Sequence, residues 1–238
     1  GATEGNSPAQ LLTTCDVVIL MVADDDAVNE IVNGEAGLLS ANISGKTIIN
    51  MSTVSAENSI AAAKLLTDHH YLDAPVSGSV KQAQEGSLVI MVGGKEDVFT
   101  DVKPVFDCLG KLALYVGENG AGNTAKLAIN ALLAFHAQGL AEAVSFAEKK
   151  GVAGNNLLTL INNSALGNVF MKIKGDAILT ANYNAAFALK HIVKDLRLAN
   201  DAGLNSPLAL AAKNSFELAA DRFAEEDIIS IYKAIDQA

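Results

Sequence analysis

The 238-residue sequence has few positive charges and no run of them. Lysine and arginine together number 17 against 27 aspartates and glutamates, which gives a formal net charge of −10 and a pI near 4.8. A protein that binds a phosphate backbone or an anionic membrane surface needs a concentrated positive patch. The composition therefore predicts no nucleic-acid partner and no membrane-surface partner.

Long apolar stretches are also missing. The longest runs, such as residues 17–23, are far shorter than the roughly 20 residues that a membrane-spanning helix needs. We therefore expect no membrane span, and no signal-peptide pattern opens the chain. Hydrophobic residues make up 50% of the sequence and charged residues 18%, which suits a globular protein with one large core or two smaller ones.

Cysteine and histidine are too scattered for a metal site or a disulfide framework. Cys15 and Cys108 lie far apart, and the four histidines include one adjacent pair, His69 and His70. Zinc sites need such ligands at short, characteristic spacings. We expect no metal and two reduced, buried thiols, which agree with a cytoplasmic location. The three aspartates at 24–26 are interpreted as the cap of a helix, in preference to a cation site.

What the sequence does contain, up to residue 117, is an alternation of strand-like and helix-like segments. The first strand, DVVILMV, is a β-branched run of the kind that is buried on both faces in a parallel sheet. Strands that alternate with helices indicate an α/β sheet with crossover connections. Strands are predicted at residues 16–22, 46–51, 71–72, 87–92 and 111–116, and helices at residues 7–14, 27–32, 56–67 and 96–108.

Strand-like segments disappear beyond Gly117. Glycines and helix caps separate six helical segments that follow. We predict two domains, an α/β domain over residues 1–118 and an all-helical domain over residues 119–238. The helices are expected at residues 123–149, 155–162, 169–180, 187–202, 207–220 and 227–235.

A loop running into a helix at residues 120–130, GAGNTAKLAIN, holds the first candidate for catalysis. Asn123 or Thr124 can cap the helix, and Lys126 and Asn130, four residues apart, share one of its faces. A desolvated lysine has a lowered pKa and can exchange a proton with a substrate oxygen. A lysine that extends its amine into water from the helix start accounts for the pattern equally well.

Two other segments are unusual. Ser77, Gly78 and Ser79 form a tight turn whose hydroxyls and backbone N–H groups suit a carboxylate, although a turn can also need glycine for steric reasons alone. Lys194 and Asp195 lie within a predicted helix. Adjacent residues do not face each other across a helix, so a solvated face is the ordinary explanation for this pair.

Three motifs in this order resemble the signatures of the β-hydroxyacid dehydrogenase family, which includes 3-hydroxyisobutyrate dehydrogenases, tartronate semialdehyde reductases and glyoxylate/succinic semialdehyde reductases. They are DAPVSG with the later MVGG, GAGNTAK with Asn130, and residues 187–196. The resemblance spans essentially the whole chain. It implies a partial Rossmann-type doubly wound sheet followed by an all-helical domain. It also implies NAD- or NADP-dependent interconversion of a small β-hydroxy acid and its aldehyde-acid.

The resemblance implies roles for individual residues as well. Lys126, at the junction of the two domains, is the expected general acid/base, with Asn130 beside it in the substrate site. The substrate carboxylate is expected at the turn formed by Ser77, Gly78 and Ser79. The cofactor is expected to contact Val22, Ala23, Thr53 and Lys194. Val22 and Ala23 lie at the end of the first predicted strand and Thr53 follows the second, which agrees with the rule that α/β sheets bind ligands beyond the carboxyl ends of their strands.

Two features depart from the family pattern. Ser79 stands where the family usually has glycine, which would restrict the turn or add a hydroxyl to the substrate site. No Gly-x-Gly-x-x-Gly sequence opens a strand-to-helix turn, so the pyrophosphate cradle is missing from the chain as given. Because Gly1 matches a point past that fingerprint and is not a methionine, we hypothesise that a segment of about fifty residues, a βα unit and a half, has been lost upstream.

A non-catalytic binding or scaffolding member of the same family is the rival prediction, and the missing glycine loop is its motive. Retention of Lys126 argues against it. The choice between NAD and NADP depends on a position upstream of Gly1, and the substrate on side chains such as those of residues 163–170, so neither is predicted. The apolar helix that begins near residue 123 predicts a homodimer or homotetramer.

Overall fold

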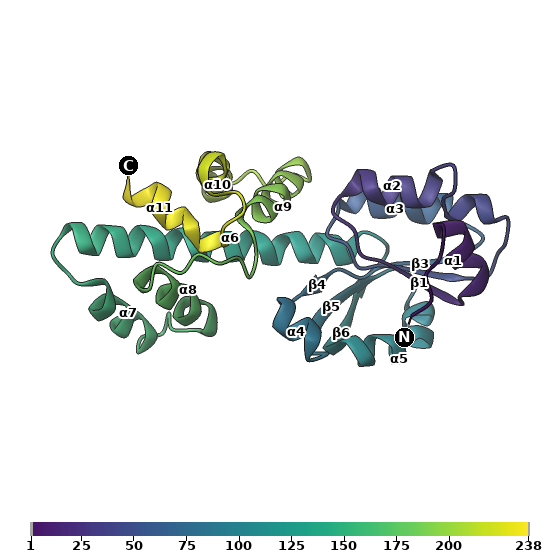
Figure 1. The fold of residues 1–238 in the computed structure, drawn as a ribbon, viewed down its shortest axis with the longest axis horizontal. Coiled ribbons are helices and arrows are strands. Elements are labelled where there is room, and N and C mark those ends of the chain that lie inside the picture. The colour runs from purple at the N-terminus through teal and green to yellow at the C-terminus, as the bar shows by residue number, and fades with distance from the viewer. Residues whose placement is uncertain (1, 238) are drawn as a thin grey trace. The chain divides into compact units, whose positions relative to one another are not determined.

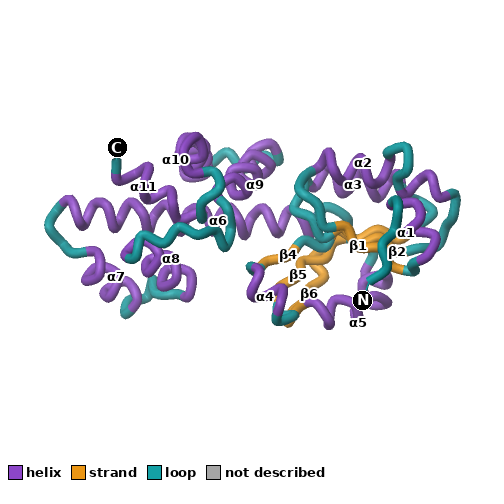
Figure 2. Tube along the Cα trace, in the orientation of Figure 1, coloured by secondary structure: helices purple, strands orange, loops and turns teal. Residues whose placement is uncertain are grey.

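A computed structural model describes residues 2–237 of the chain, which divide into two compact units with the boundary after Leu127. The first unit is built on a six-stranded sheet, and the second is entirely helical (Figure 2). The predicted α/β sheet followed by helices is therefore confirmed. The predicted domain border, between residues 118 and 119, falls in the connection that precedes the long helix of the second unit.

The sheet of the first unit carries helices on both faces, with α2 and α3 on one face and α5 on the other (Figure 1). Its strands are β1 (Val17–Leu20), β2 (Thr47–Asn50), β3 (His70–Asp73), β4 (Val76–Ser77), β5 (Leu88–Gly93) and β6 (Gly110–Gly117). The helices are α1 (Pro8–Thr14), α2 (Asp25–Asn33), the 3-10 helix η1 (Leu38–Ala41), α3 (Ala56–Leu65), α4 (Val80–Gln84) and α5 (Glu96–Leu109).

Two separate hydrophobic clusters cover the two faces of this sheet. Ile48 and Ile49 are consecutive in β2, so their side chains point to opposite faces. Ile48 packs in a cluster with Val28 of α2, whereas Ile49 packs in a cluster with Phe106 of α5. All four side chains are fully buried. The consecutive apolar residues of β2 thus reflect burial of the strand on both faces of the sheet.

The strand order is β1-β2-β3-β5-β4, with β6 paired to β5. β1, β2 and β3 are parallel, and so are β5 and β6, but β5 runs antiparallel to both β3 and β4. The sheet is therefore mixed. Residues 78–87, which join β4 to β5, are too few for a parallel crossover of a dozen or more residues, so the chain returns in the opposite direction.

The expectation that the first strand is buried on both faces is wrong. Ile19 of β1 is 42% exposed and Met21, just beyond it, is 59% exposed. β1 is the edge strand of the described sheet and has a neighbour on one side, β2. The β-branched run predicts the strand correctly but does not predict its place in the sheet order.

The cysteines are free, but they are exposed and not buried as expected. Cys15 caps the C-terminus of α1, and Cys108 lies in the last turn of α5, where its Sγ donates to the Pro104 carbonyl at 3.3 Å. Both positions are at helix ends on the surface. The interpretation of residues 24–26 as a helix cap is confirmed for Asp24, whose carboxylate accepts from Ala27 N at 3.0 Å.

The second unit is organised along α6 (Ala121–Lys149), which begins within the first unit and continues past Leu127. In Figure 1, α9 and α10 lie on one side of α6, and α7 and α8 lie on the other. The remaining elements are α7 (Gly154–Asn162), α8 (Val169–Leu179), α9 (Leu189–Asp201), α10 (Pro207–Phe223), the 3-10 helix η2 (Ile228–Ser230) and α11 (Ile231–Asp236).

By length and composition alone, α6 is one helix among the described residues that could cross a membrane. The sequence predicts this helix at residues 123–149 and its apolar character. Ala134, Ala137 and Ala141 of α6 are fully buried in the core of the second unit, together with Val144 and Phe216. This packing accounts for part of the apolar composition of the helix.

Candidate active site

The carboxyl ends of β1 and β2 bring the predicted cofactor residues of the first unit together. Val22 follows β1, and its backbone N donates to Ser52 Oγ at 2.9 Å in the loop after β2. Thr53 is the next residue of that loop. Val22 and Thr53 are half-buried, whereas Ala23 is exposed. The three residues therefore lie in two neighbouring loops at the edge where α/β sheets bind ligands.

Asp73, the last residue of β3, is a buried carboxylate that holds the start of α6. Its oxygens accept from Gly120 N at 2.8 Å, from Asn123 N at 3.1 Å and from Asn119 Nδ2 at 3.4 Å. Burial raises the pKa of Asp73, and the bonds from Gly120 and Asn123 oppose that change. A carboxylate at a helix N-terminus also suits the helix dipole.

Gly122 makes this close approach of α6 to the sheet sterically feasible. A Cβ at that position would lie 2.5 Å from the Asp73 carbonyl oxygen and 2.6 Å from the Met91 carbonyl oxygen. Sequence reasoning did not find the contact between Asp73 and α6. An acidic residue directly after an apolar strand, followed by Ala-Pro, is the signal that was available.

Asn123 is fully buried and does not cap the helix as expected. Its Oδ1 accepts from Val54 N at 3.1 Å, and its Nδ2 donates to Ser59 Oγ at 2.9 Å. Thr124 Oγ1 donates to the Gly120 carbonyl at 2.9 Å. The amide of Asn123 therefore joins the first turn of α6 to the loop after β2 and to α3.

Lys126 follows Asn123 by three residues in α6 and is only 9% exposed. The alternative prediction, that Lys126 extends its amine into water from the start of the helix, is therefore wrong. The structure places Lys126 in the same unit as Val22 and Thr53, on the helix whose first turn is bonded to the loop that contains Thr53. A buried amine next to a ligand-binding edge of a sheet is suited to proton transfer.

The turn at Ser77, Gly78 and Ser79 has the steric requirement for glycine that was weighed for it. Gly78 has φ +143°, and a Cβ there would lie 2.8 Å from Leu88 Cδ2, so the turn needs glycine sterically. Ser79 N and Ser79 Oγ donate to Gln82 Oε1 at 2.8 and 2.6 Å. With φ −102°, Ser79 occupies a conformation open to any residue, so serine in place of glycine does not restrict the turn.

Asn130 and Lys194 meet at a buried aspartate within the second unit. Asn130 Nδ2 donates to Asp195 Oδ2 at 2.6 Å, and Lys194 Nζ lies 3.2 Å from Asp195 Oδ1. Asn130 and Asp195 are 2% and 3% exposed. The prediction that Asp195 lies on a solvated helix face is therefore wrong. Asp195 lies on the buried side of α9, together with Ile192 and other apolar residues.

The described residues contain no candidate metal centre. Within residues 2–237, no three or more His, Cys, Asp and Glu side chains are grouped so that they could hold a metal ion. The adjacent histidines His69 and His70 lie at the start of β3. His69 Nδ1 accepts from Lys46 N at 3.3 Å. Desolvation lowers the pKa of His69.

Comparison with known proteins identifies both parts of the chain. Residues 1–117 match a family model described as the NAD binding domain of 6-phosphogluconate dehydrogenase. Residues 120–235 match one described as the NAD-binding domain of NADP-dependent 3-hydroxyisobutyrate dehydrogenase. Glyoxylate/succinic semialdehyde reductase 1 of Arabidopsis thaliana is 34% identical over 225 residues, which cover 92% of this chain and 78% of that protein. The chain belongs to the β-hydroxyacid dehydrogenase family. It is an NAD(P)-dependent oxidoreductase.

Solved structures of the family have the same fold. A 3-hydroxyisobutyrate dehydrogenase of Mycobacterium tuberculosis, solved with L-serine, superposes with a TM-score of 0.89 at 27% identity, covering 97% of this chain and 83% of that one. A different kind of relative, human cytokine-like nuclear factor N-PAC, is 32% identical over 241 residues. The match covers 98% of this chain but only 44% of that protein.

The described residues fit part of an NAD(P) site. The loops at the carboxyl ends of β1 and β2 supply the edge that such a cofactor uses in doubly wound sheets. The sequence contains no Gly-x-Gly-x-x-Gly turn for the pyrophosphate. The part of such a site that the described residues fit is therefore the edge formed by the loops after β1 and β2.

Proposed function

We propose that this protein reduces a small aldehyde-acid to the matching hydroxy acid, or catalyses the reverse oxidation, with Lys126 as general acid/base. When bound, NAD(P)H supplies the hydride. Lys126 gives a proton to the oxygen of the carbonyl as it is reduced and takes that proton back from the hydroxyl in oxidation. The observation that supports this best is the burial of Lys126 on a helix bonded to the loop that contains Thr53.

The remaining site residues have proposed roles in binding and orientation. Val22, Ala23, Thr53 and Lys194 are proposed to contact the cofactor. The turn at residues 77–79 is proposed to bind the carboxylate of the substrate, because it offers Ser77 Oγ and backbone N–H groups. Asn130 is proposed to orient the substrate oxygen. Its bond to Asp195 supports this role, since the bond fixes the rotation of the amide and directs Oδ1 away from that carboxylate.

Lys126→Ala in the natural full-length protein tests the assignment of the general acid. We expect kcat to fall by about 10²- to 10⁴-fold, the usual contribution of a positioned proton donor, while the Kd for NADPH changes little. Lys111→Ala, which removes an exposed lysine on β6, is the matched control. Near wild-type kcat in Lys126→Ala would remove Lys126 from this role.

The substrate is proposed to be glyoxylate or succinic semialdehyde, because the Arabidopsis relative bears both names and is 34% identical. Initial rates with glyoxylate, succinic semialdehyde, tartronate semialdehyde and 3-hydroxyisobutyrate, each with NAD(H) and NADP(H), test this. A kcat/KM for 3-hydroxyisobutyrate or tartronate semialdehyde well above that for both proposed substrates would contradict it.

A non-catalytic binding role is the second candidate function. It is favoured by the 32% identity to N-PAC, which is named as a nuclear factor and not as an enzyme. Titration of the full-length protein with NADH and NADPH separates the two functions. Cofactor binding together with turnover of any of the four substrates supports the enzyme, and cofactor binding with no turnover supports the binding role.

A further inference from the structure

We infer that Asn123 is a positioning residue, which fixes the loop after β2 relative to the turn of α6 that carries Lys126. The inference rests on the proposed function. Asn123 is fully buried, and three of its polar groups are bonded to three different parts of the first unit. Its backbone N donates to Asp73 Oδ2, its Nδ2 donates to Ser59 Oγ, and its Oδ1 accepts from Val54 N.

The bond to Val54 has a direct consequence for Thr53. The N–H of Val54 and the carbonyl of Thr53 belong to one planar, trans peptide unit and therefore point in opposite directions. When Asn123 Oδ1 holds the N–H at 3.1 Å, the Thr53 carbonyl is held pointing the opposite way within the same peptide plane. The peptide between Thr53 and Val54, in the loop proposed to line the cofactor, is thereby oriented by Asn123 of α6, 69 positions after Val54.

Neighbouring residues of this loop are fixed by other parts of the unit. Ser52 N donates to Asn50 Oδ1 at 3.0 Å, and Ser55 N donates to Asp25 Oδ1 at 2.9 Å. Neither partner belongs to α6. Through the amide of Asn123, a displacement of α6, and hence of Lys126, reaches the peptide between Thr53 and Val54.

This geometry predicts a kinetic signature that differs from that of Lys126. Loss of the proton donor lowers kcat and leaves cofactor affinity unchanged. Loss of the Asn123 side chain releases the loop and the helix from each other, so cofactor affinity and kcat fall together. Removal of Ser59 Oγ leaves the bond to Val54 in place and is expected to affect folding alone.

Asn123→Ala and Ser59→Ala in the full-length protein test the inference, with Kd for NADPH, kcat and the hydrogen exchange of the Val54 amide as readouts. We expect Asn123→Ala to weaken NADPH binding and to lower kcat by about tenfold each, which corresponds to the loss of one well-formed hydrogen bond. The Val54 amide should lose its protection against exchange. In Ser59→Ala all three values should stay within about twofold of wild type.

Wild-type NADPH affinity and Val54 protection in Asn123→Ala would overturn the inference, and so would equal losses in Ser59→Ala, which would indicate general destabilisation. If Asn123→Ala does not fold, Asn123→Ser, which leaves a smaller cavity, replaces it with the same expectations. The proposed function fails on a different measurement, the kcat of Lys126→Ala. Val54 exchange and NADPH affinity still report on Asn123 in that case.

Discussion

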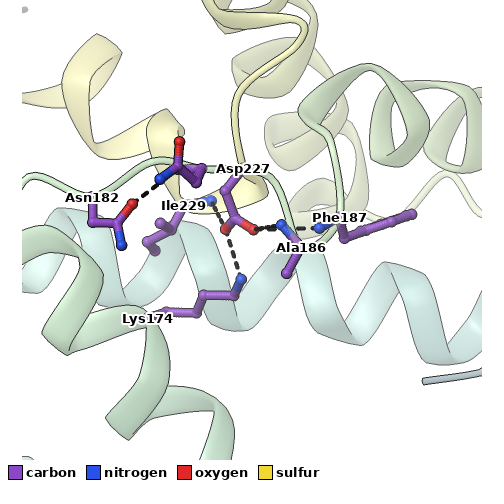
Figure 3. Close-up of polar contacts among 7 residues, drawn as sticks. Lys174, Asn182, Ala186, Phe187, Asp227 and Ile229 are labelled. Atoms are coloured by element: carbon purple, nitrogen blue, oxygen red, sulfur yellow. Dashed lines mark hydrogen bonds and ion pairs between the residues drawn. The ribbon is translucent and has the colours of Figure 1, made fainter. Parts of the chain in front are cut away.

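At the scale of single residues, Asp227 illustrates how the helical unit accommodates a buried charge. Asp227 is 2% exposed and forms an ion pair with Lys174, 8% exposed, at 2.7 Å (Figure 3). Its carboxylate also accepts from the backbone N–H groups of Ala186, Phe187 and Ile229 at 3.0, 3.3 and 3.1 Å. The pair thereby ties α8 to the segment that leads into α9 and to η2.

Lys174→Met should destabilise the protein by about 3 kcal/mol, because it leaves a buried carboxylate without its cation. The three backbone donors keep the loss at the lower end of the range for broken buried pairs. Urea denaturation measures the free energy of unfolding. Lys172→Met, an exposed lysine on the same helix, is the control and should cost less than about 0.5 kcal/mol. Equal midpoints for the two variants would contradict the prediction.

Glu217 predicts a pH dependence of stability. Hydrogen bonds from Arg197 at 2.6 Å and Lys213 at 3.2 Å lower the pKa of Glu217 below 4.5. A carboxyl whose pKa is lower in the folded state stabilises the fold above its unfolded pKa, and this contribution is lost as the pH falls through the folded pKa.

Glu217→Gln should therefore cost up to about 1 kcal/mol at pH 7, since Arg197 is exposed and solvent screens its pair with the partly buried Glu217. The difference from wild type should disappear at pH 3 or below. Thermal unfolding at pH 7, 5 and 3 measures it, with Asp221→Asn, an exposed carboxylate four residues along α10, as the control. A difference that is constant with pH would show that the charge of Glu217 is not its cause.

At the scale of elements, α6 contains two glycines whose replacement should have opposite effects. A Cβ at Gly122 would lie within 2.6 Å of two backbone carbonyl oxygens of the sheet, and backbone atoms cannot move aside cheaply. A Cβ at Gly139 meets nothing within 4 Å. Both residues are in the same helix, where alanine is preferred to glycine by about 1 kcal/mol.

Gly139→Ala should therefore raise the free energy of unfolding by about 0.5–1 kcal/mol, whereas Gly122→Ala should lower it by at least about 2 kcal/mol. Gly122→Ala should also weaken NADPH binding, because it forces the start of α6 away from Asp73. Urea denaturation and a cofactor titration measure these effects. Stabilisation by both substitutions would mean that α6 does not approach the sheet closely at Gly122.

Helices and strands with a clear period could be predicted from the sequence, but short elements could not. β4 has two residues and α4 has five, which is too few for a hydrophobic period to appear in the sequence. Both elements flank the turn at Gly78. The motif at residues 120–130 predicted Lys126 as a candidate site residue, because a lysine in an apolar helix can be recognised within a short stretch of sequence. Its supporting contacts were not predicted. Asp73 and Gly120 are 47 residues apart, and Asn123 and Val54 are 69 apart, so only the folded chain brings them together.

At the scale of the whole molecule, the two units differ in how they cover their apolar surface. The sheet of the first unit buries one cluster under α2 and α3 and another under α5. The second unit has one core around α6 and leaves large apolar side chains on its surface. Among them, Phe146, Leu160, Leu166, Val169 and Leu218 are each at least 66% exposed. Exposed apolar side chains favour association where they are contiguous.

These exposed side chains of the second unit are where we expect the contact of the predicted homodimer or homotetramer. Light scattering should give a mass of at least twice 24.7 kDa for this chain at micromolar concentration. Phe146→Glu on α6 should shift the mass toward the monomer, since a charge in an apolar contact is costly to desolvate. Leu114→Glu, at a 54% exposed leucine of β6 in the first unit, is the control and should leave the mass unchanged. A monomer at all concentrations would refute the predicted association, and a dimer that survives Phe146→Glu but not Leu114→Glu would move the contact to the sheet.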